Sequence, residues 1–188
     1  MRSIYGLKSI AIAASVLMLW GCAKEEPKEG KPTNAQASVK QGKQDDLLKD
    51  TQKVGTPEYG YVYVPKDWAH FKDVDGNNSL QMSKGDGSQI LSLNIVKGPE
   101  TASLQDYANS LAKGMEGKGI TDIKGAKTKI KQYDALQLYG TYKNGANYLI
   151  VWVFKPEDGK AHYIALEGPK DQIMQQVRLI EEGGWFSS

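Results

Sequence analysis

The sequence predicts an α+β domain in which helices flank an antiparallel β-sheet. Residues 148–154 are apolar on both faces of a strand, which is typical of a strand covered on both sides. Asn144-Gly145 separates two strand-like stretches and is a strong hairpin signal. Helical spacing of apolar residues begins after Ser103 and again after Pro169. Together these observations predict an α/β/α sandwich with one helix layer on each face of the sheet.

The strands are predicted where apolar and polar residues alternate between turn signals. The first of them alternates tyrosine with glycine and valine and is ended by Pro65. A glycine-rich turn over residues 84–87 separates the next two. The predicted strands span residues 59–64, 79–83, 89–97, 126–131, 135–142, 147–154 and 161–167.

Two helices are predicted from their caps and their apolar faces. Ser103 and Asp106 form a capping box, and glycines at 117 and 119 end the helix that follows. Pro169 opens the last helix, and Gly183-Gly184 ends it. We expect Trp185 and Phe186 to fold back on the core. The inner faces are predicted to consist of Leu104, Tyr107, Ala108, Leu111 and Met115 in the first helix, and Ile173, Met174, Val177 and Ile180 in the second.

Residues 1–21 have the pattern of an export signal. Arg2 and Lys8 give a positive start, and an apolar run follows over residues 10–20. That run is too short for a membrane-spanning helix, which needs about 20 apolar residues. The prediction is a signal peptide that places the rest of the chain outside the cytoplasm.

Leu19-Trp20-Gly21-Cys22 closes this segment and holds the only cysteine of the chain. It resembles the lipobox of bacterial lipoproteins, although Trp20 replaces the usual small or aliphatic residue. The resemblance implies that Cys22 takes a diacylglycerol and becomes the first mature residue, anchored in a bacterial membrane. The alternative is a plain signal peptide with an incidental cysteine. Stable anchoring takes two or more acyl chains, since each buried CH₂ contributes only about 0.8 kcal/mol.

Residues 22–55 follow as a predicted disordered tether, and residues 56–188 as the folded domain. The tether is rich in Lys, Glu, Gln, Asp, Gly and Pro and has no aromatic residue. Such a composition buries too little apolar surface to offset the entropy of ordering. We expect the tether to hold the domain near the membrane and clear of its surface.

Charge and cysteine content exclude several classes of function. Residues 1–21 hold two of the 24 basic residues and none of the 22 acidic ones, so the remainder is neutral. A neutral chain is not expected to bind nucleic acid, which requires a basic surface. One cysteine permits neither an internal disulfide nor a thiolate metal site. No cofactor is predicted.

The order of elements resembles the PsbP/Mog1-like fold. The resemblance covers residues 58–188 and depends on four features: the opening Tyr61-Val62-Tyr63-Val64-Pro65-Lys66-Asp67-Trp68, the helix after Ile95-Val96, the Asn144-Gly145 hairpin and the C-terminal helix. Bacterial envelope lipoproteins with this domain are known. The resemblance implies a binding or assembly module without catalytic activity.

Two groups of residues are candidates for a partner surface. Tyr59, Tyr61 and Tyr63, with Trp68 nearby, are either an aromatic platform for a glycan or peptide, or a stripe half-buried beneath a helix. Lys127, Lys129 and Lys131 share one predicted strand face. That face either meets anionic phospholipid or wall polymer, or protects a strand edge from aggregation.

Metal and catalytic signals are weak. Asp73, Asp75 and Asn77 offer oxygen ligands for calcium, but the glycine spacing is wrong for an EF-hand and the residues also suit an ordinary turn. His70 and His162 are the only histidines, and G-x-S-x-G is absent from the sequence. We therefore predict no metal site and no enzyme.

The expected function is that of a lipid-anchored extracytoplasmic binding or assembly module of the bacterial envelope. Its partners would be the membrane, through Cys22, and an envelope protein or wall polymer. A small envelope hydrolase is the alternative from another class, and a pocket joining a histidine to a buried carboxylate would favour it. A carrier that holds a small apolar ligand between sheet and helix is the third possibility.

Overall fold

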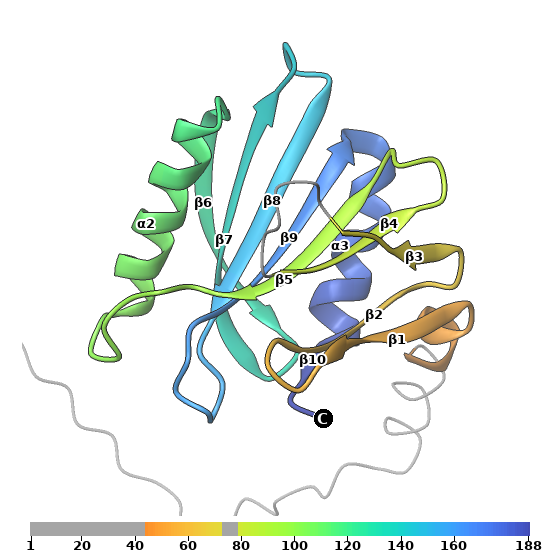
Figure 1. Ribbon diagram of the computed structural model, residues 1–188, viewed down its shortest axis with the longest axis horizontal. Coiled ribbons are helices and arrows are strands. Elements are labelled where there is room, and N and C mark those ends of the chain that lie inside the picture. Colours follow the sequence, from red (N-terminus) through yellow and green to blue (C-terminus); the bar gives the residue numbers. More distant parts are fainter. Residues whose placement is uncertain (1–43, 73–78) are drawn as a thin grey trace, which may run out of the picture. The chain divides into compact units, whose positions relative to one another are not determined.

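The computed structural model of the chain describes residues 44–72 and 79–188. The strands of its main sheet are β3 (Trp68–His70), β4 (Leu80–Lys84), β5 (Ile90–Ile95), β6 (Thr121–Ile130), β7 (Tyr133–Tyr142), β8 (Asn147–Phe154) and β9 (His162–Pro169). Every neighbouring pair is antiparallel, in the spatial order β3-β4-β5-β9-β8-β7-β6 (Figure 1). A second, three-stranded sheet joins β1 (Thr51–Thr56), β2 (Gly60–Pro65) and β10 (Trp185–Phe186).

The two long helices cover opposite faces of the main sheet. Helix α2 (Leu104–Gly117) contacts β6, β7 and β8, whereas α3 (Lys170–Gly183) contacts β9, β6 and β8 and also the small sheet. The predicted fold class, an antiparallel sheet with a helix layer on each side, is confirmed. Among the described residues, no helix combines the length and apolar character needed to cross a membrane.

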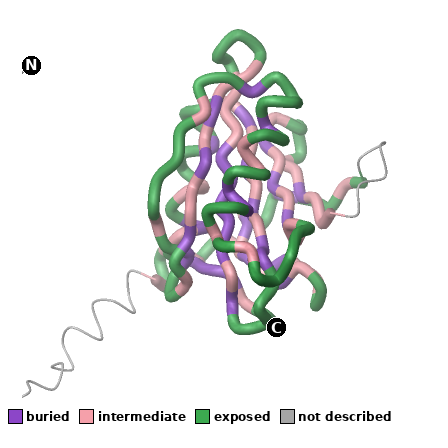
Figure 2. Tube along the Cα trace, turned by 90° about the vertical axis from the view of Figure 1, so that its left-hand side faces the viewer, coloured by how far each residue is buried: buried purple, intermediate pink, exposed green. Residues whose placement is uncertain are grey.

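Strand β8 lies inside the sheet and contributes to two cores. Ile150, Trp152 and Phe154 pack with α3 and the small sheet, and Val151 and Val153 pack with α2. All five side chains are buried. Buried positions, purple in Figure 2, run along the strands, while exposed positions, green, occur at the loops and along the helices. The apolar pattern on both faces of this stretch therefore reflects cover on both sides, as the sequence predicted.

Local signals act as expected at the cap and the hairpin. The Ser103 hydroxyl accepts from the Asp106 backbone N–H at 3.2 Å, and the Asp106 carboxylate accepts from the Ser103 N–H at 3.0 Å. Asn144 and Gly145 both have positive φ, 57° and 82°, which the turn between β7 and β8 requires. The capping box and the hairpin predicted from sequence are confirmed.

Three strand predictions need correction. β1 lies inside the predicted tether, so ordered structure begins before residue 56, and residues 44–48 form a helical turn ahead of it. β3 was not predicted, and β6 begins at Thr121, five residues before the predicted start. Each of these strands is at the edge of a sheet, where one free side tolerates polar residues and the apolar alternation is weak. Residues 1–43, including most of the predicted tether, lie outside the described part of the chain.

The C-terminus closes the core of the small sheet. Trp185 is 3% exposed, and its indole N–H donates to the Tyr59 carbonyl at 2.9 Å. Its ring lies against the backbone of Gly60, where a Cβ would come within 2.1 Å of the indole. Gly60 also has a φ of 76°, so this position needs glycine for both reasons. The predicted return of Trp185 to the core is confirmed.

Candidate functional site

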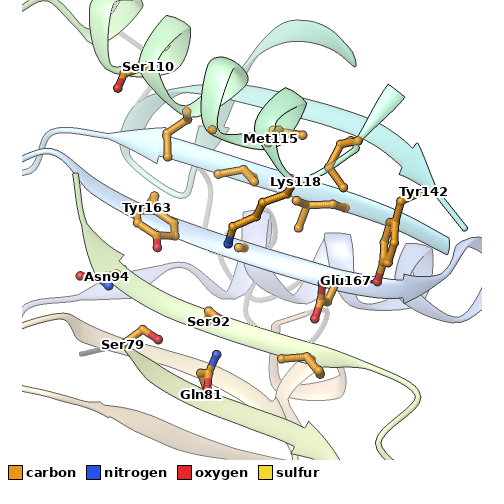
Figure 3. Close-up of a pocket in the computed structure, with 17 residues that line it drawn as sticks. Ser79, Gln81, Ser92, Asn94, Ser110, Met115, Lys118, Tyr142, Tyr163 and Glu167 are labelled. Carbon is orange, nitrogen blue, oxygen red and sulfur yellow. Dashed lines mark hydrogen bonds between the residues drawn. The ribbon is translucent and has the colours of Figure 1, made fainter. Parts of the chain in front are cut away.

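One face of the main sheet is only partly covered, and a pocket of about 490 Å³ lies there. Helix α2 shields β6, β7 and β8, but no described helix covers the same face of β9, β5 and β4. The pocket is therefore bounded by the sheet as its floor and by α2 as one wall (Figure 3). Its size is within the range of about 300–1,000 Å³ typical of small-ligand sites.

The hollow results from small residues in the middle of the floor. Ser92 on β5 pairs with Ala165 on β9, and both side chains line the pocket. Two positions away on β9, in either direction, stand the longer side chains of Tyr163 and Glu167. Residues two apart on a strand share a face, so the small central pair leaves a depression between taller neighbours.

The floor changes from apolar to polar with distance from the helix. The apolar lining residues near α2 are Leu111, Met115, Ile120, Leu149 and Val151. The polar lining residues on the uncovered side are Ser79 just before β4, Gln81 on β4, and Ser92 and Asn94 on β5, whereas Ile90 of β5 is an apolar exception. This distribution suits a ligand that has an apolar part and an uncharged hydrogen-bonding part.

Gly114 lies on the side of α2 that forms one wall of the pocket. It lies within α2, where glycine costs about 1 kcal/mol relative to alanine. A Cβ at this position would meet nothing within 4 Å, so packing within the domain does not require glycine. Gly114 lines the pocket, and the missing side chain leaves the helix backbone open to it.

Among the lining residues that the structure describes, Lys118 and Glu167 are the charged ones. Figure 3 shows Lys118 reaching from the end of α2 across the floor, and Glu167 beside Tyr142. The Tyr142 hydroxyl donates to Glu167 Oε2 at 3.3 Å and accepts from Asn147 Nδ2 at 3.3 Å. Burial, and to a smaller extent the Glu167 charge, raises the pKa of the Tyr142 phenol. Burial also raises the pKa of Tyr163, so both phenols are neutral at physiological pH.

The predicted tyrosine stripe lies on the small sheet, away from the pocket. Tyr61 and Tyr63 point outward from β2 and are half-buried, with Lys53 4.7 Å above the Tyr61 ring. Phe186 packs edge-on against Tyr63 at 5.6 Å. Trp68 is 4% exposed and belongs to the core, so it contributes nothing to an exposed platform. Tyr59 packs partly against the same core.

The predicted lysine stripe is shorter than three residues. Lys127 and Lys129 are exposed on β6, and Lys129 Nζ forms an ion pair with Asp134 at 2.8 Å. Lys131 follows the strand with a φ of 54°, and its ammonium group lies 4.7 Å above the Phe186 ring. The turn after β6 therefore takes Lys131 out of the alternation that the sequence suggested.

The two histidines lie apart from the pocket. His70 is exposed at the end of β3. His162 is 2% exposed, its Nε2 lies 2.8 Å from Asp158 Oδ2, and its ring is 4.8 Å from that of Trp185. It belongs to the face of β9 that packs toward α3, opposite to the pocket.

Four predicted site residues lie outside the described residues: Cys22, Asp73, Asp75 and Asn77. Within residues 44–72 and 79–188, no three His, Cys, Asp or Glu side chains form a group suited to a metal ion.

The pocket residues were not identified from the sequence. A signal was present on β5, where Ser92 and Asn94 alternate with the buried Leu91 and Leu93. Gly114, a glycine inside a predicted helix, was a second one. Their convergence depends on the pairing of β5 with β9, which is not visible in either stretch alone.

Comparison with known proteins gives structural neighbours and no family. No family model matches the chain, and no curated protein matches it. A crystal structure at 1.50 Å from Bacteroides thetaiotaomicron VPI-5482 is similar over 71% of this chain and 46% of its own, with 15% identity and a TM-score of 0.45. LpqN of Mycobacterium tuberculosis, described as involved in cell envelope biogenesis, is similar over 73% of this chain and 92% of its own, with 19% identity and a TM-score of 0.42. This chain thus spans under half the length of the Bacteroides protein.

Proposed function

We propose that this protein is a lipid-anchored, extracytoplasmic binding protein of the bacterial envelope, without catalytic activity, and that its ligand occupies the pocket beside α2. The observation that supports binding is the pocket itself, with its small central residues and its open helical wall at Gly114. The proposed location comes from the signal and the Cys22 motif of the sequence.

The lining chemistry favours an amphipathic ligand over a wholly apolar one. A fully apolar ligand would cover the hydroxyl groups of Ser79 and Ser92 without offering them a hydrogen-bond partner. Burying an uncompensated amide or hydroxyl costs about 1–3 kcal/mol. A ligand with polar groups over β4 and β5 avoids that cost and still uses the apolar side near α2.

The hydrolase alternative has less support from the arrangement of side chains. A serine nucleophile needs a base within hydrogen-bond reach. Ser79, Ser92 and Ser110 line the pocket, but no histidine lines it, and Glu167 is bonded to Tyr142. The pair of His162 and Asp158 lies on the opposite face of the sheet.

The proposed lipid anchor would keep the binding site close to the membrane. A domain held to a membrane by a flexible tether has a high effective concentration toward ligands and partners at that membrane. The pocket then needs only modest intrinsic affinity to be occupied there.

Filling the pocket tests the proposal. Gly114→Leu should place a side chain into the opening without disturbing the fold, since the position has open space and leucine favours a helix. Gly117→Leu is the matched control, because Gly117 also has open space, lies in the same helix and does not line the pocket. Small molecules that co-purify with each full-length variant from native membranes are measured by mass spectrometry.

We expect a compound that is retained by the parent protein and by Gly117→Leu, and is lost from Gly114→Leu. If both variants retained the compound equally, the pocket would not be its binding site. Absence of any compound from the parent protein would contradict stable ligand binding.

A second candidate is assembly with another envelope protein or a wall polymer. The outward cluster of Tyr61, Tyr63 and Phe186 favours it, because aromatic side chains are enriched at protein interfaces. Proximity crosslinking from the tethered protein should capture a partner that is lost in a Tyr61→Ala/Tyr63→Ala variant. Capture that is unchanged by this variant would place the contact elsewhere.

A further inference from the structure

Among the described residues that line the pocket, one side chain is positive, one is negative, and the two do not pair with each other. The Lys118 ammonium forms no hydrogen bond or ion pair with any residue in the described ranges. Glu167 receives only the 3.3 Å contact from the Tyr142 hydroxyl. Each of the two side chains can therefore attract a ligand group of the opposite charge.

The backbone explains why the two charges stay apart. Lys118 is the C-cap residue of α2, and its N–H donates to the Met115 carbonyl at 3.0 Å. Glu167 is fixed on β9 between Leu149 of β8 and Ile90 of β5. One charge thus belongs to the wall and the other to the floor, and the space between them is the pocket.

The groups between the charges are neutral and suit peptide bonds. Ser92 carries a hydroxyl that can both donate and accept. Asn94 carries a side-chain amide, whose oxygen also accepts from the Ile95 N–H at 2.7 Å. A peptide group presents one donor and one acceptor, which these side chains complement. The apolar residues near α2 can take an aliphatic side chain.

We propose that the ligand is a short zwitterionic peptide, with its carboxylate at Lys118, its ammonium at Glu167 and its amide groups over β5. This inference rests on the proposed function, since it assigns the chemistry of the same pocket. A volume of about 490 Å³ limits the ligand to a few residues.

The two ends are expected to contribute unequally. Lys118 is exposed, so its attraction for a carboxylate is screened by water and salt. Glu167 is half-buried beside Tyr142, so its attraction for an ammonium group is screened less. The amino end of the peptide should therefore carry more of the specificity.

The tripeptide Ala-Leu-Ala in four forms serves as the probe: free termini, N-acetylated, C-amidated, and blocked at both ends. Each form is titrated calorimetrically into the detergent-solubilised full chain. Acetylation should weaken binding about tenfold, in line with a hydrogen bond to a charged group. Amidation should weaken it about threefold and lose most of that effect at high salt.

Substitutions test which residue binds each terminus of the peptide. Glu167→Gln should bind the free and acetylated peptides equally, and Lys118→Met should bind the free and amidated peptides equally. Glu116→Gln and Lys113→Met are the controls, because both residues are exposed on α2 and neither lines the pocket. The controls should keep the full preference for free termini.

The outcomes separate this inference from the proposed function. If Gly114→Leu abolishes binding but all four forms bind the parent chain equally, the pocket stands and the charge assignment is wrong. If no form binds while Gly114→Leu still loses a co-purified compound, the ligand is not a peptide. A preference for free termini that persists in Glu167→Gln and Lys118→Met would also overturn the assignment.

Discussion

Glu181 connects α3 to the main sheet through side-chain hydrogen bonds. One carboxylate oxygen accepts three hydrogen bonds: from Trp152 Nε1 at 2.9 Å, Thr128 Oγ1 at 3.0 Å and Gln137 Nε2 at 3.1 Å. The donors come from β8, β6 and β7, so a single side chain joins three strands to the helix. The Glu181 backbone carbonyl also accepts from the Lys131 N–H at 2.7 Å.

Replacement of this carboxylate should be costly. Glu181→Leu leaves the indole N–H of the fully buried Trp152 without its acceptor. Each unsatisfied buried donor costs about 1–3 kcal/mol, so we expect a loss of about 2–4 kcal/mol in the free energy of unfolding, measured by urea titration.

Glu182→Leu is the control, because Glu182 is exposed and pairs with Arg178 on the same helix. It should change the unfolding midpoint little. A Glu181→Leu protein as stable as the parent would show that water replaces the carboxylate, and that the three donors are not isolated from solvent.

At the scale of elements, α2 is the wall of the pocket, and its first turn is held by the capping box at Ser103. Ser103→Ala removes the acceptor for the Asp106 N–H and should lower stability by about 1 kcal/mol. It should also accelerate hydrogen exchange in the first turn of α2. Unchanged exchange in Ser103→Ala would mean that Tyr107, buried and bonded to the Pro99 carbonyl at 2.6 Å, secures the helix alone.

Strands and helices with a strong local sequence pattern could be predicted. Strands that depend on hydrogen bonds to a partner strand could not. The apolar residues of β8 require cover on both faces, so its sequence alone indicates an interior strand. β1 reads Thr-Gln-Lys-Val-Gly-Thr, with Val54 as its one buried side chain. Its partner β2 supplies the hydrogen bonds that make it a strand. Because β1 is mostly polar, its composition alone predicts that it belongs to the disordered tether.

The pocket was hidden from the sequence for a related reason. Its hollow exists because Ala165 and Ser92 are neighbours across two strands that are far apart in the chain. Trp68 is a further example, because its sequence position near the tyrosines leaves open whether it belongs to an aromatic surface or to buried structure. It faces the core because β3 pairs with β4 and directs its indole inward.

At the scale of the whole molecule, four buried or partly buried tyrosines link stability to alkaline pH. Burial is the main cause of the raised pKa of each: Tyr59, Tyr133, Tyr142 and Tyr163. The unfolded chain loses these protons near pH 10.0, whereas the folded chain retains them to higher pH. Their contribution to stability is therefore complete below that pH and falls as the pH rises above it.

We expect the urea midpoint to fall once the pH exceeds about 10, and to fall less in Tyr163→Phe, which removes one such group. Urea titrations of both proteins at neutral and alkaline pH measure the effect. The same alkaline loss in both proteins would show that Tyr163 ionises as easily in the folded chain as in the unfolded one.

The proposed membrane attachment also concerns the whole chain and is tested at Cys22. Cys22→Ala should release the protein from membranes and leave the domain folded, as judged by fractionation and circular dichroism. A variant that remains in the membrane fraction would contradict the lipoprotein prediction. The thermal stability of the domain over residues 56–188 should not change.

The small sheet has a consequence for the order in which the chain can fold. β2 pairs with β1 near the beginning of the described residues and with β10 at their end, and Trp185 bonds to Tyr59 across 126 residues of sequence. A chain that leaves the cytoplasm amino end first delivers β2 early and its last partner late. Such long-range pairing is slow, because loop closure precedes its contacts. For a chain exported as proposed above, the core would therefore be complete only after the final residues have crossed the membrane.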